Sequence, residues 1–375
     1  MPEELSRTVG LALGAPGKRM GDETVTYFAD PETTSPKIPA VSGATGTPPF
    51  ISGYEIHGEI ARGGMGLVLE AWDAVLDREV AIKVLLPGSD STTAAERFVR
   101  EAKLTARLPH PGIPPVHALG TLADGSPYLA MKLIRGQTLA NHLVSPDRPS
   151  LPRLVQIFEQ IAQAVGFAHT QGIIHRDLKP LNVMVGAFGE VQVMDWGLAK
   201  ELQIADCELP KEASADQTPP GEMTQTGAIV GTAAYISPEQ ARGEAVDART
   251  DVFALGAILF EILTGERPWG SGSKAELVGR AQQALLDPSY QRLCASAADA
   301  ELLALAKRAL APRAEERFAT GQKVAEAVAA YRSGVEDRLR QAETDRAAAE
   351  ARASEQGKKR RAMQIAGGVI AAVLI

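Results

Sequence analysis

The sequence has little cysteine and no excess of positive charge. Cys207 and Cys294 are its two cysteines, and neither has another Cys or a His nearby at metal-ligand spacing. Neither a disulfide framework nor a structural zinc site is therefore indicated, and a reducing compartment is expected. The formal net charge of −7 argues against a nucleic-acid partner, because binding to phosphates in any sequence needs many cations.

Internal repeats and an amino-terminal apolar run are also missing. No basic segment at the start leads into a long apolar core, so no secretory signal peptide is expected. The absence of a repeat at about 20–50 residues gives no support to a solenoid or a propeller. Residues 1–53 are rich in Pro, Thr, Ser and Gly without a sustained period, which predicts a disordered leader.

The pattern changes at Tyr54. Three short runs rich in β-branched residues and leucine predict antiparallel strands: YEIHGEI, LVLEAW and EVAIKVLL. AAERFVREAKLTARL predicts a helix, and VHALGTL and YLAMKLI predict further strands. After Pro152 an apolar stripe at helical spacing appears, and DVFALGAILFEILTG is apolar almost all round, as in a helix inside a large domain. The stripe consists of Leu154, Ile157, Phe158, Ile161, Val165 and Ala168. A strand-rich lobe followed by a helix-rich lobe is expected.

A glycine-rich hairpin and a lysine in a strand indicate phosphate binding. IARGGMGLV has Gly63 and Gly66, whose backbone can approach a ligand and direct N–H groups at phosphate oxygens. It is not a Walker A loop, because no GK[ST] follows. The next cation is Lys83 in VAIK, and a lysine buried in a strand needs a carboxylate such as Glu101 on the following helix. The alternative is a lysine that reaches solvent along its stem.

The stretch GIIHRDLKPLNVMV sets polar side chains between apolar runs. Asp177 is a candidate base for a hydroxyl proton, Lys179 a point charge for a transferred phosphoryl group, and Asn182 an oxygen ligand for Mg²⁺. Asp195, at the end of the next short apolar strand, can chelate the same cation. In-line phosphoryl transfer needs little covalent help, so positioned charges of this kind suffice.

The ordered set IARGGMGLV, VAIK, the Glu101 helix, HRDLKPLN, DWG and GTAAYISPEQ resembles that of the eukaryotic-like (Hanks-type) Ser/Thr protein kinases, in the style of bacterial receptor kinases. The resemblance covers residues 54–332. It implies an α+β, two-lobed kinase fold, with a small β-rich N-lobe over 54–134 and a larger α-helical C-lobe over 135–332. It also implies ATP, with Mg²⁺ or Mn²⁺, and protein substrates phosphorylated on Ser or Thr.

The resemblance also implies roles for single residues. Lys83 would contact the α and β phosphates, with Glu101 orienting it. Asp177 would position the substrate hydroxyl, and Asn182 and Asp195 would hold the metal. Lys179 and Thr232 of GTAAY would complete the catalytic group and match the Ser/Thr branch. The rest of the ATP site would be Ile60, Ala61, Gly63, Gly64, Met65, Gly66, Val68 and Ala81, with Met131 behind the adenine and Lys132, Leu133 and Ile134 as the hinge.

Supporting contacts and departures follow from the same resemblance. Glu239 should pair with Arg317, and Asp251 should brace the catalytic-loop backbone. Ala61 stands where the family has its first loop glycine, which should have a modest effect. Trp196 replaces the phenylalanine of DFG, and its larger ring needs a partner for the indole N–H.

Two other functions compete with this interpretation. A pseudokinase scaffold, which binds nucleotide and partners without turnover, usually lacks a catalytic group, and here Lys83, Glu101, Asp177, Asn182 and Asp195 are all present. A small-molecule phosphotransferase lacks an activation segment that ends in GT..Y..PE, whereas this chain has one.

The activation segment itself predicts a switch. Its acidic, Pro-containing insert CELPKEASADQTPPGE has the composition of a disordered segment. MTQTG then offers Thr224 and Thr226 for autophosphorylation, with Arg176 as the receiver of the phosphate.

The carboxyl end predicts a helix and then a membrane anchor. Residues 333–357 are Ala- and charge-rich, and their thin apolar seam leaves two interpretations open: a solvated single helix, or weak pairing of two kinases as a homodimer. The seam is Val335, Leu339, Ala342, Ala349 and Ala353, interrupted by Arg346.

Residues 358–375 hold the basic cluster Lys358–Arg361 and then IAGGVIAAVLI. As a helix this run would span roughly 16 Å, against a hydrocarbon core of about 30 Å, so we interpret it as the start of a longer transmembrane helix. The cluster would place the kinase on the cytoplasmic side of the cell membrane, as a single-pass protein. The alternative is a soluble kinase with an apolar tail.

Overall fold

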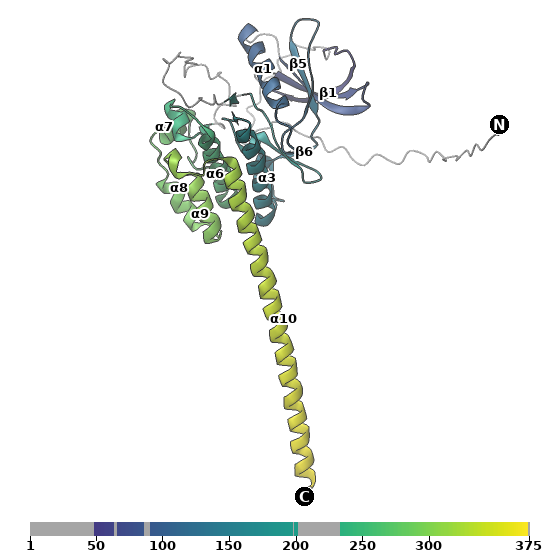
Figure 1. Ribbon diagram of the computed structural model, residues 1–375, viewed down its shortest axis with the longest axis vertical. Helices are drawn as coiled ribbons and strands as arrows, with labels where there is room; N and C mark the ends of the chain where they lie inside the picture. Colours follow the sequence, from purple (N-terminus) through teal and green to yellow (C-terminus); the bar gives the residue numbers. More distant parts are fainter. Residues whose placement is uncertain (1–48, 64–65, 86–90, 198, 202–232, 374–375) are drawn as a thin grey trace, which may run out of the picture.

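The computed structural model describes residues 49–63, 66–85, 91–197, 199–201 and 233–373. These residues form a β-rich lobe and a helical lobe, and one long helix projects from the helical lobe (Figure 1). The predicted order, strands first and helices second, is confirmed. The expected leader over 1–53 lies almost wholly outside the described residues.

The β-rich lobe is a five-stranded antiparallel sheet with the order β1-β2-β3-β5-β4. Side chains of β2 alternate between buried and half-buried, which is the pattern of a sheet with one covered face. Helix α1 packs Phe98 and Ala102 against Leu85 and Leu129 of the sheet. The elements are β1 (Tyr54–Arg62), β2 (Gly66–Asp73), β3 (Arg78–Leu85), α1 (Ser91–Ala106), β4 (Val116–Thr121) and β5 (Pro127–Lys132).

The helical lobe is built around α3 (Leu151–Thr170) and α6 (Ala248–Thr264). All six residues of the predicted stripe on α3 are buried, and α6 is buried along most of its length, as its sequence predicts. The other elements are β6 (Gly136–Thr138), α2 (Leu139–Val144), β7 (Ile173–Ile174), the 3-10 helix η1 (Pro180–Asn182), β8 (Val183–Gly186), β9 (Val191–Val193), β10 (Lys200–Glu201), α5 (Pro238–Arg242), α7 (Lys274–Gln282), α8 (Asp287–Ala295), α9 (Ala300–Ala309) and η2 (Ala314–Glu316).

The long helix α10 runs from Gly321 to Val373. Val324, Ala325 and Val328 are buried in the helical lobe, whereas the side chains from Val335 to Lys359 are exposed. One continuous helix thus crosses the domain boundaries predicted at 332 and 357, which stay predictions. None of the helices in the described ranges is both long and apolar enough to cross a membrane.

Helices α3 and α10 meet backbone to backbone. A Cβ added to Gly166 would lie 2.4 Å from the backbone nitrogen of Gln322, and one added to Gly321 would lie 2.8 Å from the nitrogen of Gly166. Only glycine leaves room for this crossing, because the Cβ of any other residue would collide with backbone atoms of the facing helix, which cannot rotate away. The contact places the start of α10 beside the end of α3 that leads into the catalytic loop.

The substitution Gly166→Ala should therefore push the two helices apart. We expect a loss of about 1–3 kcal/mol in the free energy of unfolding, the usual cost of overpacking, measured by urea denaturation. Gly279→Ala on α7 is the matched control, since a Cβ there meets nothing within 4 Å. The control should be neutral or slightly stabilising, because alanine favours a helix by about 1 kcal/mol over glycine. Equal effects of the two substitutions would contradict the close crossing.

Candidate active site

Lys83 on β3 lies between two carboxylates. Its Nζ donates to Glu101 Oε1 on α1 at 2.8 Å and lies 3.7 Å from Asp195 Oδ1. Burial would lower the pKa of Lys83, but Glu101 and Asp195 outweigh it and the pKa is raised. The predicted pairing with Glu101 is confirmed, and the alternative of an unpaired lysine reaching solvent is wrong. The charged ammonium is held where it can meet phosphate oxygens.

Asp195 follows β9 in a left-handed backbone conformation, with φ +59°. Burial acts to raise the pKa of Asp195, but the cations Lys83 and Lys179 outweigh it and the pKa is lowered. Gly197 makes the approach to α1 feasible, because a Cβ there would lie 3.0 Å from Glu101 Oε2. Asp195 is thus an ionised carboxylate fixed beside Lys83.

The catalytic loop brings together the three polar residues predicted from its sequence. Lys179 Nζ donates to Asp177 Oδ2 at 2.8 Å, and Asn182 Nδ2 donates to the Asp177 carbonyl oxygen at 2.9 Å. The backbone N–H of Met194 donates to the Asn182 carbonyl oxygen at 2.7 Å. Because Met194 directly precedes Asp195, this last bond holds Asn182 near Asp195, although the two residues are thirteen positions apart in the sequence.

A buried carboxylate holds the backbone of the catalytic loop. Asp251 on α6 accepts the backbone N–H groups of His175, at 2.7 Å, and Arg176, at 2.8 Å. Arg176 has φ +69°, a strained conformation for a residue with a side chain. The predicted brace is confirmed, and it fixes the strained residue that directly precedes Asp177.

An apolar cluster spans the two lobes where the adenine was predicted. Buried Ile134 packs with three partly buried residues that the sequence predicts for the ATP site. They are Ile60 and Ala61 of β1 and Leu133 of the hinge. Met131 stands opposite Ala81, and Val68 opposite Lys83, in the sheet. Sequence reasoning missed two members, Met184 and Met194. Their positions in the sequence could have indicated that they lie in the site, because Met184 comes two residues after Asn182 and Met194 directly precedes Asp195.

The glycine-rich hairpin closes at Gly63, whose N–H donates to the Gly66 carbonyl oxygen at 2.9 Å. A side chain at Gly66 would collide with the Val84 carbonyl oxygen, because its Cβ would lie 2.8 Å away. The remaining predicted residues, Gly64, Met65, Thr224, Thr226 and Thr232, lie outside the described residues.

The family model for the protein kinase domain matches residues 54–328. The chain belongs to the protein kinase family. Its predicted relation to the eukaryotic-like Ser/Thr kinases is confirmed by its relatives. The chain is similar to the serine/threonine-protein kinase PknB of Mycobacterium leprae, with 44% identity over 229 residues, 60% of this chain and 34% of that protein.

Two further relatives show the same partial coverage. PknB of Mycobacterium tuberculosis is 42% identical over 233 residues, 60% of this chain and 35% of that protein. PknD of Protochlamydia amoebophila, also a serine/threonine-protein kinase by name, is 35% identical over 247 residues, 62% of this chain and 25% of that protein. The kinase therefore matches a quarter to about a third of the length of these relatives.

The donor set of the kinase fits a hard divalent cation. The amide nitrogen of Asn182 is engaged by Asp177, which leaves the amide oxygen for a cation, and Asp195 adds a carboxylate. Within the ranges that the structure describes, no three His, Cys, Asp or Glu side chains gather as a metal cluster. Two protein oxygens suit Mg²⁺, which keeps several waters and takes ligands from substrate phosphates.

Trp196 is buried with its indole N–H hydrogen-bonded. Its indole N–H donates to the Val193 carbonyl oxygen at 3.1 Å, and its side chain is buried. The ring packs on His175, with centroids 4.6 Å apart, while His175 Nε2 donates to the Met194 carbonyl oxygen at 3.0 Å. The tryptophan therefore fills the phenylalanine position and ties the segment that carries Asp195 to the catalytic loop.

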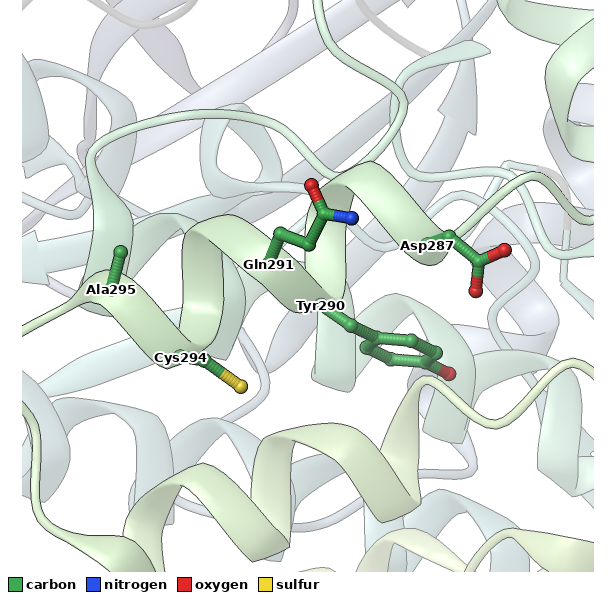
Figure 2. A pocket seen from close by; sticks show the side chains of 5 residues that line it. All are labelled: Asp287, Tyr290, Gln291, Cys294 and Ala295. Atoms are coloured by element: carbon green, nitrogen blue, oxygen red, sulfur yellow. The ribbon is translucent and has the colours of Figure 1, made fainter.

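A surface pocket on α8 shares no residue with this site. Figure 2 shows its lining, which comes from one helix: Asp287, Tyr290, Gln291, Cys294 and Ala295. Cys294 Sγ accepts from Lys307 Nζ at 3.0 Å. The chemistry of the kinase lies at the boundary of the two lobes instead.

The end of the activation segment is anchored by a buried ion pair. Arg317 donates to both carboxylate oxygens of Glu239, at 2.7 and 3.0 Å, and its side chain is fully buried. Burial acts to raise the pKa of Glu239, but Arg317 outweighs it and the pKa is lowered. The predicted pair is confirmed.

Arg317→Met should leave Glu239 buried without its partner. The expected loss in the free energy of unfolding is about 3–5 kcal/mol, measured by urea denaturation at neutral pH. Arg313→Met is the matched control, because Arg313 pairs with Glu315 and Glu316 in an exposed position, where ion pairs contribute little. A loss at Arg317 no larger than at Arg313 would rule out a stabilising role for the buried pair.

Proposed function

We propose that this protein transfers the γ-phosphoryl group of ATP to Ser or Thr hydroxyls of protein substrates, and that it autophosphorylates in signal transduction. The observation that carries the proposal is the assembled pair Lys83–Glu101 at 2.8 Å, with Asp195 beside it. An intact pair of this kind supports an enzyme over the pseudokinase scaffold. The names of the relatives support Ser and Thr as acceptors.

Each charged group has a role in positioning or neutralisation. Lys83, oriented by Glu101, holds the phosphates of ATP beneath the glycine-rich hairpin. Asn182 and Asp195 would hold Mg²⁺ or Mn²⁺, which would neutralise charge on the phosphates. Lys179 places a further positive charge beside Asp177, where the transferred group passes.

Asp177 orients the substrate hydroxyl and accepts its proton as the oxygen attacks. Its Oδ2 is engaged by Lys179 and, at 3.3 Å, by Asn182 Nδ2. These bonds fix the carboxylate rotamer before substrate binds. The cluster of Ile60, Ala61 and the hinge would enclose the adenine, with Met184 and Met194 as its floor.

Asp177→Asn should abolish most phosphoryl transfer, because an amide cannot accept the hydroxyl proton. General bases contribute about 10²- to 10⁴-fold, so kcat should fall by that order, while ATP binding measured by calorimetry stays close to wild type. Asp124→Asn, in the exposed β4–β5 turn, is the control and should keep full activity. Undiminished phosphorylation of casein by the Asp177 variant would refute the mechanism.

We also propose that residues 358–375 attach the kinase to the cell membrane, with the kinase domain in the cytoplasm. Four consecutive cations, Lys358–Arg361, precede a run without charged residues. Cations next to an anionic bilayer surface add about 1 kcal/mol of attraction each, and apolar side chains gain further by leaving water. The finer proposal, a single-pass orientation, rests on the position of the cluster before the apolar run.

The attachment predicts binding of the purified chain to lipid vesicles. The full chain should sediment with vesicles that contain phosphatidylserine, whereas a chain ending at Gly357 should stay in solution. A variant with Gln at 358–361 keeps the apolar run and should bind more weakly, because the charge attraction is lost. Equal sedimentation of the full and shortened chains would refute the anchor.

A further inference from the structure

An unbroken series of hydrogen bonds connects the start of α10 to the catalytic loop. The backbone N–H of Gly321 donates to His169 Nδ1 at 3.1 Å. His169 Nε2 lies 2.9 Å from Asp251 Oδ2, and both side chains are only 1% exposed. Asp251 in turn holds the backbone of His175 and Arg176. Three bonds therefore lead from the first residue of α10 to the residue before Asp177.

The protonation pattern of His169 follows from its partners. Because Nδ1 accepts an N–H, it carries no proton, so the proton sits on Nε2 and is donated to Asp251. The first N–H groups of a helix have no partner inside the helix, and His169 supplies one to Gly321. One ring thus caps α10 with one nitrogen and orients Asp251 with the other.

The docking of α10 on the helical lobe sets the position of this cap. Gly166 and Gly321 pack backbone to backbone, and about three turns further along α10 Arg332 pairs with Glu159 of α3 at 2.5 Å. Tyr331 donates to Asp299, before α9, at 2.8 Å. A last ion pair joins Arg338 to Glu301 of α9 at 2.7 Å, and beyond it α10 leaves the lobe (Figure 1). The contacts of Tyr331 and Arg332 therefore hold the same helix whose first residue bonds to His169.

We propose that His169 is a positioning residue through which the docking of α10 sets the geometry of the catalytic loop. Arg176 keeps its strained φ of +69° because Asp251 holds two backbone groups at once, and such conformations persist only where the surroundings impose them. If α10 shifts, His169 Nδ1 loses the N–H of Gly321 that it accepts, the ring reorients, and Asp251 loses the N–H donated by His169 Nε2. Asp177 then loses its orientation, and transfer slows without a change in ATP affinity.

Two substitutions separate the bonds of His169. In His169→Asn the amide lies near the position of Nδ1, so it can still cap Gly321 but does not reach Asp251. In His169→Gln the amide lies near the position of Nε2, so it can still donate to Asp251 but not cap Gly321. The first should lower kcat, and the second should keep kcat near wild type while disconnecting α10.

The test combines these variants with a displaced α10. Arg332→Glu sets a negative charge against Glu159, whereas Arg340→Glu is the control, since Arg340 is exposed and pairs with Asp337 of its own helix. In the full chain Arg332→Glu should lower kcat about two- to tenfold, the size of one buried hydrogen bond, with an unchanged KM for ATP. In either His169 background it should have no further effect, and Arg340→Glu should have none anywhere.

Amide hydrogen exchange gives a readout that does not depend on the proposed function. Arg332→Glu should speed exchange at His175 and Arg176 in the wild-type background and leave it unchanged in His169→Gln. A wild-type chain without transfer activity would defeat the proposed function, while the exchange data would still decide the coupling. The same fold-change in kcat and exchange in all three backgrounds, or no change in any, would overturn the role of His169.

Discussion

The buried carboxylate of Asp251 is the group on which the geometry of the catalytic loop depends. Burial acts to raise its pKa, but the hydrogen bonds from His169 and from the backbone N–H of His175 outweigh it, so the pKa is lowered. A carboxyl whose folded pKa is depressed stabilises the fold above its unfolded pKa, and this contribution is lost as the pH falls through the folded value. The ionised oxygens hold the backbone N–H groups of His175 and Arg176, the two residues that directly precede Asp177.

The second constraint joins the two lobes. Lys83 and Glu101 come from the β-rich lobe and Asp195 from the helical lobe, and the three groups meet within 3.7 Å. Neither carboxylate alone would balance the ammonium as well, since a buried cation needs several acceptors. Gly197 permits the approach because it has no side chain. Charge pairing across the lobe boundary therefore places Lys83 and Asp195, the residues proposed to bind the phosphates and the metal, in one site.

The long helix α10 is stabilised differently in its two parts. The first turns bury Val324, Ala325 and Val328 in the lobe. The exposed part has ion pairs four residues apart, such as Arg346–Glu350 at 3.0 Å and Lys359–Glu355 at 2.7 Å, each of which adds a few tenths of a kcal/mol. Such pairs allow a polar helix to extend from the domain without a partner. Because Gly321, the first residue of α10, bonds to His169, we expect a shift of α10 to change the geometry of the active site.

The amino-acid sequence by itself determined the order of strands and helices, the buried stripe on α3, and the identity of the charged groups in the active site. These depend on local periodicity and on the residue types that phosphoryl transfer requires, and both can be recognised from the sequence alone. Tertiary structure alone decided that Met184 and Met194 join the apolar cluster of Ile60, Ala61 and Ile134, and that His169 links α10 to Asp251. Both depend on which elements that are distant in the sequence pack together, and no local pattern encodes that packing.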